Sequence, residues 1–528
     1  MSTAAYQGGL ISDTGRRLPA NYKWAIVGML WCITFFNYAD RMALTANMPL
    51  IKGEFGLDKT TSGMLGSAFG YSYGLCALFA GFIVDRVRRR TAVLVGLCVW
   101  SAICMLTATA QSFWVLFMFL ALEGLGEAFY FPAAMSMVGD YHGKATRSKA
   151  MSINQTSVYF GTIGGTAFAG YLGVNHGWRS AFLVFGAMGV VLALILWRFL
   201  YEPSRGAADR ADSVADGDAD PHLIRVVSTA PADTSPFFNS TGIIGILLLV
   251  SGLVLLINTA RVIQDEPSIV TTIKEYVFFV LMVLFGLALS ALRHLRKDRE
   301  FWRFFRVFMT TPTAVLLLLA FLSANSVATI VLVWMPTFVF ENVYAGNTAM
   351  LAVAGTFATM PLQLASMIGS PSGGTLADYL RARTPRGRIL VQMLGVLCAV
   401  PFVFLCGQMQ EKWALIAVLA GWGLFKGVYD SNIWAGVYDV VRPELRGMTT
   451  GFMNMIAWGG GALAPIGAGY IADWCKQNGI ENGLGRAISG ASGIYILSGL
   501  LLFTAAMLFV KRDSARMQAE VKAEAQQV

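Results

Sequence analysis

The chain has 528 residues, of which 56% are hydrophobic and only 13% are charged, and its formal net charge is +9. Soluble domains carry about 25% charged residues, so these proportions exclude a water-soluble fold and make a lipid bilayer the solvent for much of the surface. In a membrane protein, a basic excess is better explained by loops on one side of the bilayer than by nucleic-acid binding. We therefore expect the bilayer as a partner and no nucleic acid.

The first apolar segment begins at about residue 24, after a polar tail at 1–23. This segment is long and carries Asp40 and Arg41, whereas the apolar core of a cleaved signal peptide is short. We therefore expect it to be the first membrane helix.

Fourteen stretches reach the roughly 20 mostly apolar residues that a spanning helix needs. They predict an all-α membrane protein with two six-helix bundles, at 24–202 and 311–511, and two further helices between them. The stretches are 24–48, 62–85, 91–110, 113–138, 149–174, 180–200, 241–260, 276–293, 312–340, 347–376, 388–407, 413–438, 448–474 and 487–510.

Between the bundles, residues 203–240 are rich in Asp, Ala, Ser and Pro, a composition typical of a flexible cytoplasmic linker. The next segment, 241–310, is predicted to form an extra transmembrane hairpin followed by a basic loop. Its apolar cores contain no ionisable residue, so we expect it either to face lipid outside the transport path or to bind another subunit. Residues 512–528 are predicted to form a cytoplasmic tail.

Basic residues follow the second, fourth, eighth, tenth and last core helices, and the opposite loops carry few of them. Because positively charged loops stay in the cytoplasm, we predict cytoplasmic termini in a multi-pass plasma-membrane protein, here of a bacterial inner membrane. The basic residues are Arg86, Arg88, Arg89, Arg90, Lys144, Arg147, Lys149, Arg381, Arg383, Arg386, Arg388, Arg442, Arg446, Lys511, Arg512 and Arg516.

The two halves of the chain repeat one another, because four residues at the end of the second core helix recur with identical spacing at the end of the eighth. They are Gly81, Asp85, Arg88 and Arg90 in the first case and Gly374, Asp378, Arg381 and Arg383 in the second. A shift of 299 positions also places Gly124 on Gly423 and Arg147 on Arg446. Parallel repeats of this kind predict a two-lobe transporter that rocks about a central site.

The repeated residues are expected to form a conformational latch. Glycine lets a neighbouring helix approach closely, and Asp85 can accept hydrogen bonds from loop arginines or face a helix N-terminus. Such contacts would hold an outward-open state and break on inward opening. Helix capping alone is the alternative interpretation.

Three stretches of the sequence resemble a known family. Residues 81–90 are similar to the loop between the second and third helices that marks the major facilitator superfamily. Residues 37–41 (Asn-Tyr-Ala-Asp-Arg) and 126–128 (Gly-Glu-Ala) resemble the anion:cation symporters within that superfamily. The resemblance implies transport of sugar acids, other carboxylates or phosphate, usually with protons or sodium. Spinster-type lipid transporters share the last two patterns.

Six ionisable residues lie inside predicted helices, where each costs roughly 2.5–3.5 kcal/mol on insertion scales and marks a functional candidate. Asp40 and Arg41 are adjacent in the first helix, so their side chains point about 100° apart and cannot both face one neighbour. We expect Asp40 to carry a proton and Arg41 to bind the solute or a partner, with a structural ion pair as the alternative.

Glu123 and Glu127 are spaced i, i+4 in the fourth helix and so share one face. Two carboxylates this close in a low dielectric resist being ionised together, which suits proton carriage near neutral pH. The family resemblance implies proton coupling at Glu127, while structural pairing stays open for Glu123. Relatives usually carry an anion-binding arginine seven residues before this glutamate, but here that position is Leu120.

Lys426 and Asp430 are also spaced i, i+4, in the tenth core helix, and could simply neutralise each other. The shift of 299 positions maps Glu127 onto Lys426, however, so related positions carry opposite charges. We predict that Lys426 supplies the cation missing at Leu120, and that it binds the solute anion or bridges to Glu127 in the empty site. Asp430 is a further candidate for solute binding.

Six uncharged polar residues are candidates for hydrogen bonds to a hydroxylated solute, although helix–helix bonding is as strong an alternative. They are Asn37, Tyr38, Tyr73, Gln155, Asn325 and Asn432.

The sequence contains no Walker loop, and its four histidines lack metal spacing. We expect neither a metal nor a cofactor, and a proton gradient rather than sodium as the energy source. The sequence as a whole predicts a monomeric secondary transporter, not an enzyme, that imports a small organic solute such as a sugar acid by proton symport and alternating access. A spinster-like lipid or drug carrier and a neutral-sugar transporter are the alternatives.

Overall fold

The computed structural model describes residues 10–11, 17–19, 21–84, 87–143, 146–202, 208, 299–442 and 445–525. The predicted linker, apart from residue 208, and both helices of the predicted hairpin lie outside these residues. The count of fourteen spanning helices therefore stays a prediction.

The N-terminal half consists of six helical spans in the predicted order. Its fourth span is broken where α4 gives way to α5, and a short antiparallel pair, β1 (Leu10–Ile11) with β2 (Arg17–Leu18), precedes the first span. The helices are α1 (Tyr22–Phe55), α2 (Lys59–Val84), α3 (Arg89–Thr107), α4 (Phe113–Glu127), α5 (Tyr130–Tyr141), α6 (Arg147–His176) and α7 (Trp178–Phe199).

The C-terminal half again has six spans, preceded by the short helix α12 (Arg299–Met309), whose Phe304 and Phe308 pack against Phe452. The remaining elements are α13 (Pro312–Phe338), η1 (Val339–Val343), η2 (Thr348–Met350), α14 (Leu351–Arg381), α15 (Gly387–Cys406), α16 (Lys412–Asp430), α17 (Ile433–Tyr438), α18 (Arg446–Gly461), α19 (Leu463–Gln477), α20 (Gly483–Gly490), α21 (Ser492–Thr504), η4 (Ala505–Phe509) and α22 (Val510–Ala525).

Eight of the described spans are long and apolar enough to cross a membrane, judged by length and composition. The four core spans that fall short are α1, α2, α6 and α16. α1 and α16 carry ionisable residues, and α2 and α6 are rich in Gly, Ser and Thr. All four contribute side chains to the cavity between the halves, which accounts for their lower hydropathy.

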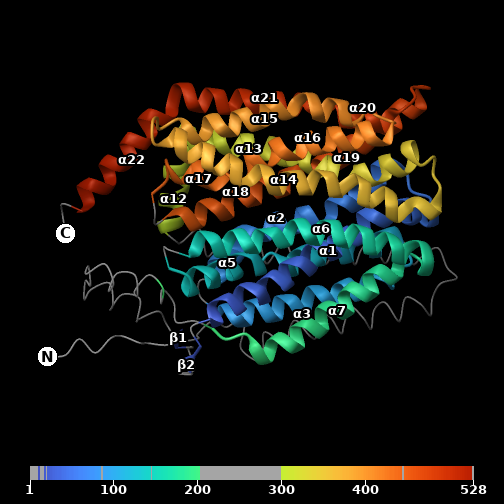
Figure 1. The fold of residues 1–528 in the computed structure, drawn as a ribbon, viewed down its shortest axis with the longest axis horizontal. Coiled ribbons are helices and arrows are strands. Elements are labelled where there is room, and N and C mark those ends of the chain that lie inside the picture. The colour runs from blue at the N-terminus through green and yellow to red at the C-terminus, as the bar shows by residue number, and fades with distance from the viewer. Residues whose placement is uncertain are drawn as a thin grey trace.

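The helices run side by side along the long axis of the molecule, with the N-terminal half (blue to green) below the C-terminal half (yellow to red) in Figure 1. The halves meet where α2 packs against α18 and α19 and where α6 packs against α14. The first contact requires glycine, since a Cβ on Gly74 would lie only 2.6 Å from the Cα of Gly459. Helices of the two halves therefore touch backbone to backbone.

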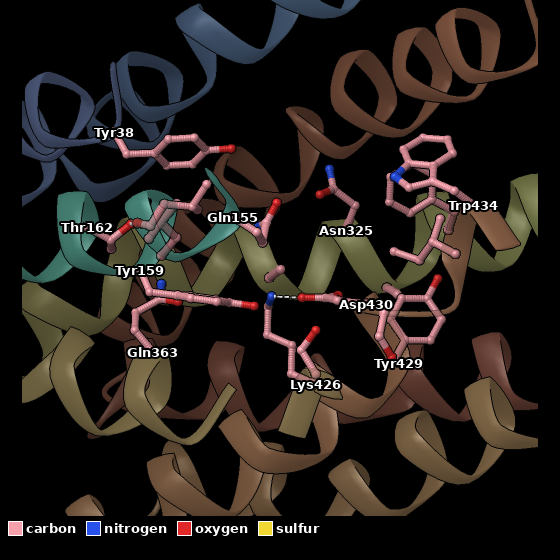
Figure 2. Close-up of a pocket in the computed structure, with 18 of the residues that line it drawn as sticks. Tyr38, Gln155, Tyr159, Thr162, Asn325, Gln363, Lys426, Tyr429, Asp430 and Trp434 are labelled. Carbon is pink, nitrogen blue, oxygen red and sulfur yellow. Dashed lines mark hydrogen bonds and ion pairs between the residues drawn. The ribbon is translucent and has the colours of Figure 1, made fainter. Parts of the chain in front are cut away.

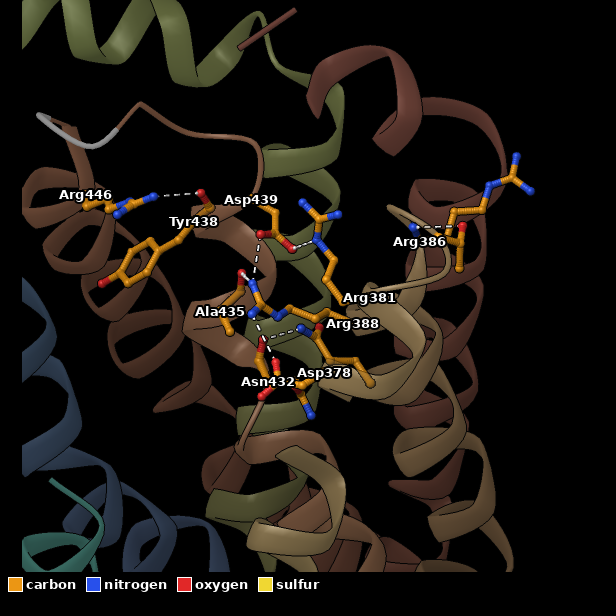
Figure 3. A network of polar contacts seen from close by, with 11 residues as sticks. Asp378, Arg381, Arg386, Arg388, Asn432, Ala435, Tyr438, Asp439 and Arg446 are labelled. Carbon is orange, nitrogen blue, oxygen red and sulfur yellow. Dashed lines mark hydrogen bonds and ion pairs between the residues drawn. The ribbon is translucent and has the colours of Figure 1, made fainter. Parts of the chain in front are cut away.

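The predicted repeat reappears in the side-chain contacts at one end of the bundle. Arg89 pairs with Asp140 in the N-terminal half, and Arg388 pairs with Asp439 at 2.8 Å in the C-terminal half (Figure 3). Each arginine also donates to a backbone carbonyl at 3.4 Å, four positions before its aspartate in both halves. The two sets are related by the shift of 299 positions. We call this end, which carries the repeated arginines, the basic end.

Alanine at Gly74 is expected to destabilise the protein, because its Cβ would overlap the backbone of α18. Overpacking costs about 1–3 kcal/mol, whereas alanine otherwise favours a helix over glycine by roughly 0.5–1 kcal/mol. Gly467→Ala in α19 is the matched control, since nothing lies within 4 Å of its Cβ position. Thermal melting in detergent should give a lower Tm for Gly74→Ala only. Equal Tm values for the two variants would contradict the tight contact.

Candidate functional site

A cavity of about 730 Å³ lies between the two halves and reaches Arg147 at the basic end. Helices of both halves line it, among them α1, α2 and α6 on one side and α13, α14, α16 and α18 on the other. Six of the residues predicted to bind the solute meet here, although they come from five different helices. They are Tyr38, Tyr73, Gln155, Asn325, Lys426 and Asp430.

The cavity wall in the C-terminal half carries an ion pair between the Lys426 amine and the Asp430 carboxylate (Figure 2). The pair is local to α16, as the i, i+4 spacing allows. The side chains remain 20% and 32% exposed to the cavity. In this structure Glu127 pairs with Arg41 instead, so the predicted bridge from Lys426 to Glu127 is not formed.

Sequence reasoning missed several cavity residues around this pair. The Tyr159 side chain points toward the Lys426 amine, and Gln363 and Trp434 also line the cavity (Figure 2). On α6 the lining residues Gln155, Tyr159 and Thr162 follow i, i+4, i+7 spacing. That polar stripe on one helix face is the signal that could have identified Tyr159.

Arg41 is fixed in the N-terminal half by one carboxylate and a set of aromatic rings. Its Nε donates to Glu127 Oε2 at 2.7 Å, and a second guanidinium nitrogen donates to the same oxygen. The guanidinium lies 4.1 Å from the ring centroid of Phe69, 4.7 Å from that of Tyr38 and 6.0 Å from that of Trp458. Cation–π contacts of this kind are strongest where water is excluded. Trp458 belongs to the other half, so this charge lies at the seam between the lobes.

Asp40 and Glu123 form an acidic site that lines the same small cavity as Arg41. Their carboxylate oxygens and the Cys104 sulfur all lie within 4.8 Å of one another, and all three residues are buried. Glu123 Oε1 has no hydrogen-bond partner. Asp40 Oδ1 accepts the Arg41 backbone N–H at 2.8 Å. Two ionised carboxylates this close repel each other, so the site favours at least one bound proton. Such donors could also hold a metal ion.

Leu120 lies beside this acidic site. It is buried and lines a small cavity of about 80 Å³ together with Asp40, Arg41 and Glu123. The position where relatives are expected to carry an arginine is therefore apolar. As a result, Arg41 is the only cation among the described residues that line this small cavity.

Three predicted solute-binding residues, Arg41, Asn37 and Asn432, do not line the main cavity. Asn37 accepts from Arg41 at 3.1 Å and so helps to orient the guanidinium. Asn432 is buried, and its amide donates to the carbonyls of Gly373 and Val428 at 3.3 and 3.1 Å. Its amide hydrogens are used in packing α16 against α14.

The predicted latch residues take part in contacts within each half. Asp85 lies outside the described residues, Gly81 lies within α2, and Arg88 is exposed directly before α3. The Arg90 backbone N–H donates to Glu202 at 2.9 Å.

In the C-terminal half, Arg381 pairs with Asp439 at 3.0 Å and Asp378 with Arg388 at 3.1 Å (Figure 3). Among the described residues, no atom lies within 4 Å of a Cβ on Gly374, so no described helix approaches it closely in this conformation. The latch between the halves stays a prediction.

The end opposite the basic end is joined by contacts that the sequence analysis did not foresee. The Asp473 carboxylate of α19 accepts the backbone N–H and hydroxyl of Thr60 at 2.7 and 2.6 Å and the N–H of Lys59 at 3.2 Å. It thereby caps the start of α2 from the other half. Glu341 in η1 pairs with Lys52 at 3.3 Å and Lys59 at 2.9 Å.

Two six-span halves around a cavity that is lined by both polar and apolar side chains and closed at one end define a two-lobe membrane transporter. The family described as Major Facilitator Superfamily matches residues 30–465. The chain belongs to that superfamily.

Similar proteins include a probable galactarate/D-glucarate transporter of Escherichia coli (strain K12), which is 25% identical over 87% of this chain and 89% of the relative. The D-galactonate transporter of Escherichia coli O6:H1 is 23% identical over 86% of this chain and 90% of its own length. Among solved structures, a bacterial homolog of the human lysosomal transporter spinster, inward-facing and unoccupied, has a TM-score of 0.66 at 18% identity. It covers 93% of this chain and 98% of that chain.

Removing one partner of the Arg41–Glu127 pair is expected to destabilise the protein by about 3–5 kcal/mol, because the remaining charge is buried without compensation. Glu127→Ala should therefore lower the Tm in detergent strongly, and the double variant Arg41→Met/Glu127→Leu should recover most of the loss. The control is Glu520→Ala, which breaks an exposed pair with Arg516 worth about 0–1 kcal/mol. Equal effects of Glu127→Ala and Glu520→Ala would contradict this assignment.

Proposed function

We propose that the protein imports a small sugar acid or related carboxylate together with protons, by alternating access in a bacterial inner membrane. The observation that carries the proposal is the charge arrangement between the halves. A lysine paired with one carboxylate lines the cavity, and three buried carboxylates, Asp40, Glu123 and Glu127, lie around one arginine. Both Escherichia coli relatives are named for sugar-acid transport, which supports the choice of solute.

In this proposal the solute carboxylate binds Lys426, which replaces the arginine absent at Leu120. The hydroxyl groups of a sugar acid need both donors and acceptors. Tyr38, Gln155 and Asn325 offer these groups from three helices facing the cavity. A solute held in this way contacts both halves, so its binding can favour their closure around it.

Protons are carried by the acidic cluster of the N-terminal half. Asp40 and Glu123 lie together, and Arg41, the cation that shares their small cavity, is held by Glu127. Protonation of Glu127 would release Arg41 and loosen its link between α1 and α4. Protons suit the Asp40–Glu123 site better than sodium, because a hard cation prefers oxygen ligands to the thiol of Cys104. The protein needs no resident cofactor in this scheme.

Alternating access is proposed because one end of the cavity is open and the other end is held closed. The positive-inside rule assigns the basic end to the cytoplasm, so this conformation is inward-facing, with cytoplasmic termini. Asp473 and Glu341 hold the periplasmic end closed. In the outward-facing state these contacts break, and the latch around Gly81, Asp85 and Gly374 closes the cytoplasmic end.

The chain works as a monomer in this proposal, and residues 241–293 add two spanning helices to the twelve of the core. Their sequence carries no charge within the apolar cores, which suits a hairpin facing lipid.

A spinster-like lipid or drug carrier is the second candidate. The aromatic side chains Trp434, Trp458 and Phe321 line the same cavity and would accommodate an apolar ligand. The likeness to the spinster homolog concerns the fold alone. An uptake panel that includes a lysophospholipid separates the two candidates.

The test is uptake into proteoliposomes with an acid exterior, using D-galactonate, galactarate, a neutral sugar and a lysophospholipid. One pH unit supplies about 1.4 kcal/mol per proton, enough for about tenfold accumulation per coupled proton. We expect sugar acids to accumulate only with the gradient, and Glu123→Gln to abolish accumulation against a gradient. Glu481→Gln, an exposed carboxylate outside both cavities, is the control. Sugar-acid uptake that is the same with and without the pH gradient would exclude proton symport. Uptake of the lysophospholipid alone would favour the second candidate.

Asp473→Ala is expected to favour the outward-facing state, because it removes three hydrogen bonds between the halves. At about 0.5–1.5 kcal/mol each, their loss should shift the equilibrium at least several-fold. Spin labels on the two halves at the periplasmic end should report a larger population at long distance, and Glu481→Ala at the same end should not. An unchanged distance distribution for Asp473→Ala would contradict the role of Asp473 in holding the periplasmic end closed.

A further inference from the structure

The main cavity contains few charges, which limits what an anionic solute can bind. Among the described residues that line it, the charged ones are Arg147, Lys426 and Asp430. Arg147 lies at the mouth, where its guanidinium donates to the carbonyls of His142 and Gly139 at 2.9 and 3.1 Å. The ion pair on α16 is therefore the charged feature inside the cavity.

A solute carboxylate must displace Asp430 to reach Lys426. The Lys426 amine is already paired with Asp430, and Arg41 is occupied by Glu127 and its aromatic rings. Displacement would leave two carboxylates facing one ammonium group in a partly dehydrated cavity. Uncompensated charge of this kind is unfavourable. One proton on Asp430 removes the excess charge, because the solute adds −1 and the proton adds +1.

Among the described groups around Asp430, none other than Asp430 itself can take up the proton that offsets the solute charge. Lys426 faces it from its own helix, Tyr159 from α6 and Tyr495 from α21, and Tyr429 precedes it on α16. Tyrosines are neutral near pH 7, so none of the three balances the charge of a bound anion. Lys426 stays protonated, since it exchanges one carboxylate partner for another. The proton must therefore go to Asp430.

Asp430 is also well placed to exchange a proton with water. Its side chain is 32% exposed to a cavity that reaches the basic end, whereas Asp40 and Glu123 are buried beside a separate small cavity. The Asp430 site in the C-terminal half is thus distinct from the Asp40–Glu123 site in the N-terminal half. Lys426 occupies the position that corresponds to Glu127 under the shift of 299 residues.

We propose that Asp430 couples proton binding to anion binding: the solute carboxylate replaces it on Lys426, and Asp430 takes up one proton in the same step. This rests on the proposed function, because it requires a carboxylate solute. It deepens that function by adding a coupling group in the C-terminal half, next to the solute itself. The solute is bound in the form of its anion plus one proton, and it is released when Asp430 loses the proton and returns to Lys426.

Calorimetric binding of D-galactonate to the purified full chain between pH 5.5 and 8.5 tests this role. One proton taken up per solute makes the wild-type affinity fall about tenfold per pH unit at the alkaline end. Asp430→Asn is isosteric and mimics the protonated carboxyl, so it should bind with at least the wild-type affinity and lose this fall. Asp430→Glu should retain the pH dependence, and Lys426→Met should abolish binding at every pH. The control is Glu520→Gln, which changes an exposed carboxylate in α22 and should behave as wild type.

Two results would overturn the inference. Full pH dependence in Asp430→Asn would place the coupled proton elsewhere. A normal melting transition in Asp430→Asn without D-galactonate binding would make Asp430 a direct solute ligand. Failure of the wild type to bind any sugar acid is a different outcome, since it would reject the proposed function and the coupling role with it.

Discussion

Charge that is buried within a bilayer has to be neutralised, and this constraint accounts for most of the interior of the protein. Arg41 is balanced by Glu127, oriented by Asn37 and covered by Phe69 and Tyr38. Lys426 is balanced by Asp430 on the next turn of its own helix. Each half thus contains the carboxylate partner of its own cation. What is left over is acidic: Asp40 and Glu123 share their small cavity with Arg41, whose guanidinium already pairs with Glu127. We propose that an exchangeable proton offsets their charge.

The same charges lie where the halves move. The guanidinium of Arg41 is within 6.0 Å of the Trp458 ring centroid, across the seam. Trp458 lies on α18, which packs against α2 through Gly74 and Gly459 with no side chain between the backbones. Packed interfaces of this kind switch between discrete arrangements rather than deform gradually. We propose that a change of charge at Glu127 acts on this contact between the halves, while Asp473 joins the halves at the start of α2.

Much of this arrangement could be predicted from the sequence, and the exceptions have physical reasons. Apolar stretches located helices at all twelve predicted core positions, and eight of these described spans are apolar enough to cross a membrane by length and composition. Identical spacings located the repeat, because both features are local properties of the chain. The Lys426–Asp430 pair follows from helix geometry alone. The partner of Arg41 depends on how α1 and α4 are rotated against each other, which no spacing encodes. Asp473 caps a helix 413 residues away in the sequence, which no local pattern indicates. Asn432 hydrogen-bonds to backbone carbonyls instead of lining the cavity, because the break between α16 and α17 leaves carbonyls near its amide. The hairpin at 241–293 lies outside the described residues.

We propose that an anion enters this cavity only with a proton. The most direct measurement is the number of protons taken up when D-galactonate binds the purified protein, obtained from binding heats in two buffers with different ionisation enthalpies at one pH near neutrality. The account predicts net proton uptake on binding, and therefore apparent enthalpies that differ between the buffers. Saturable binding with the same enthalpy in both buffers would mean that no proton accompanies the solute, and would contradict it.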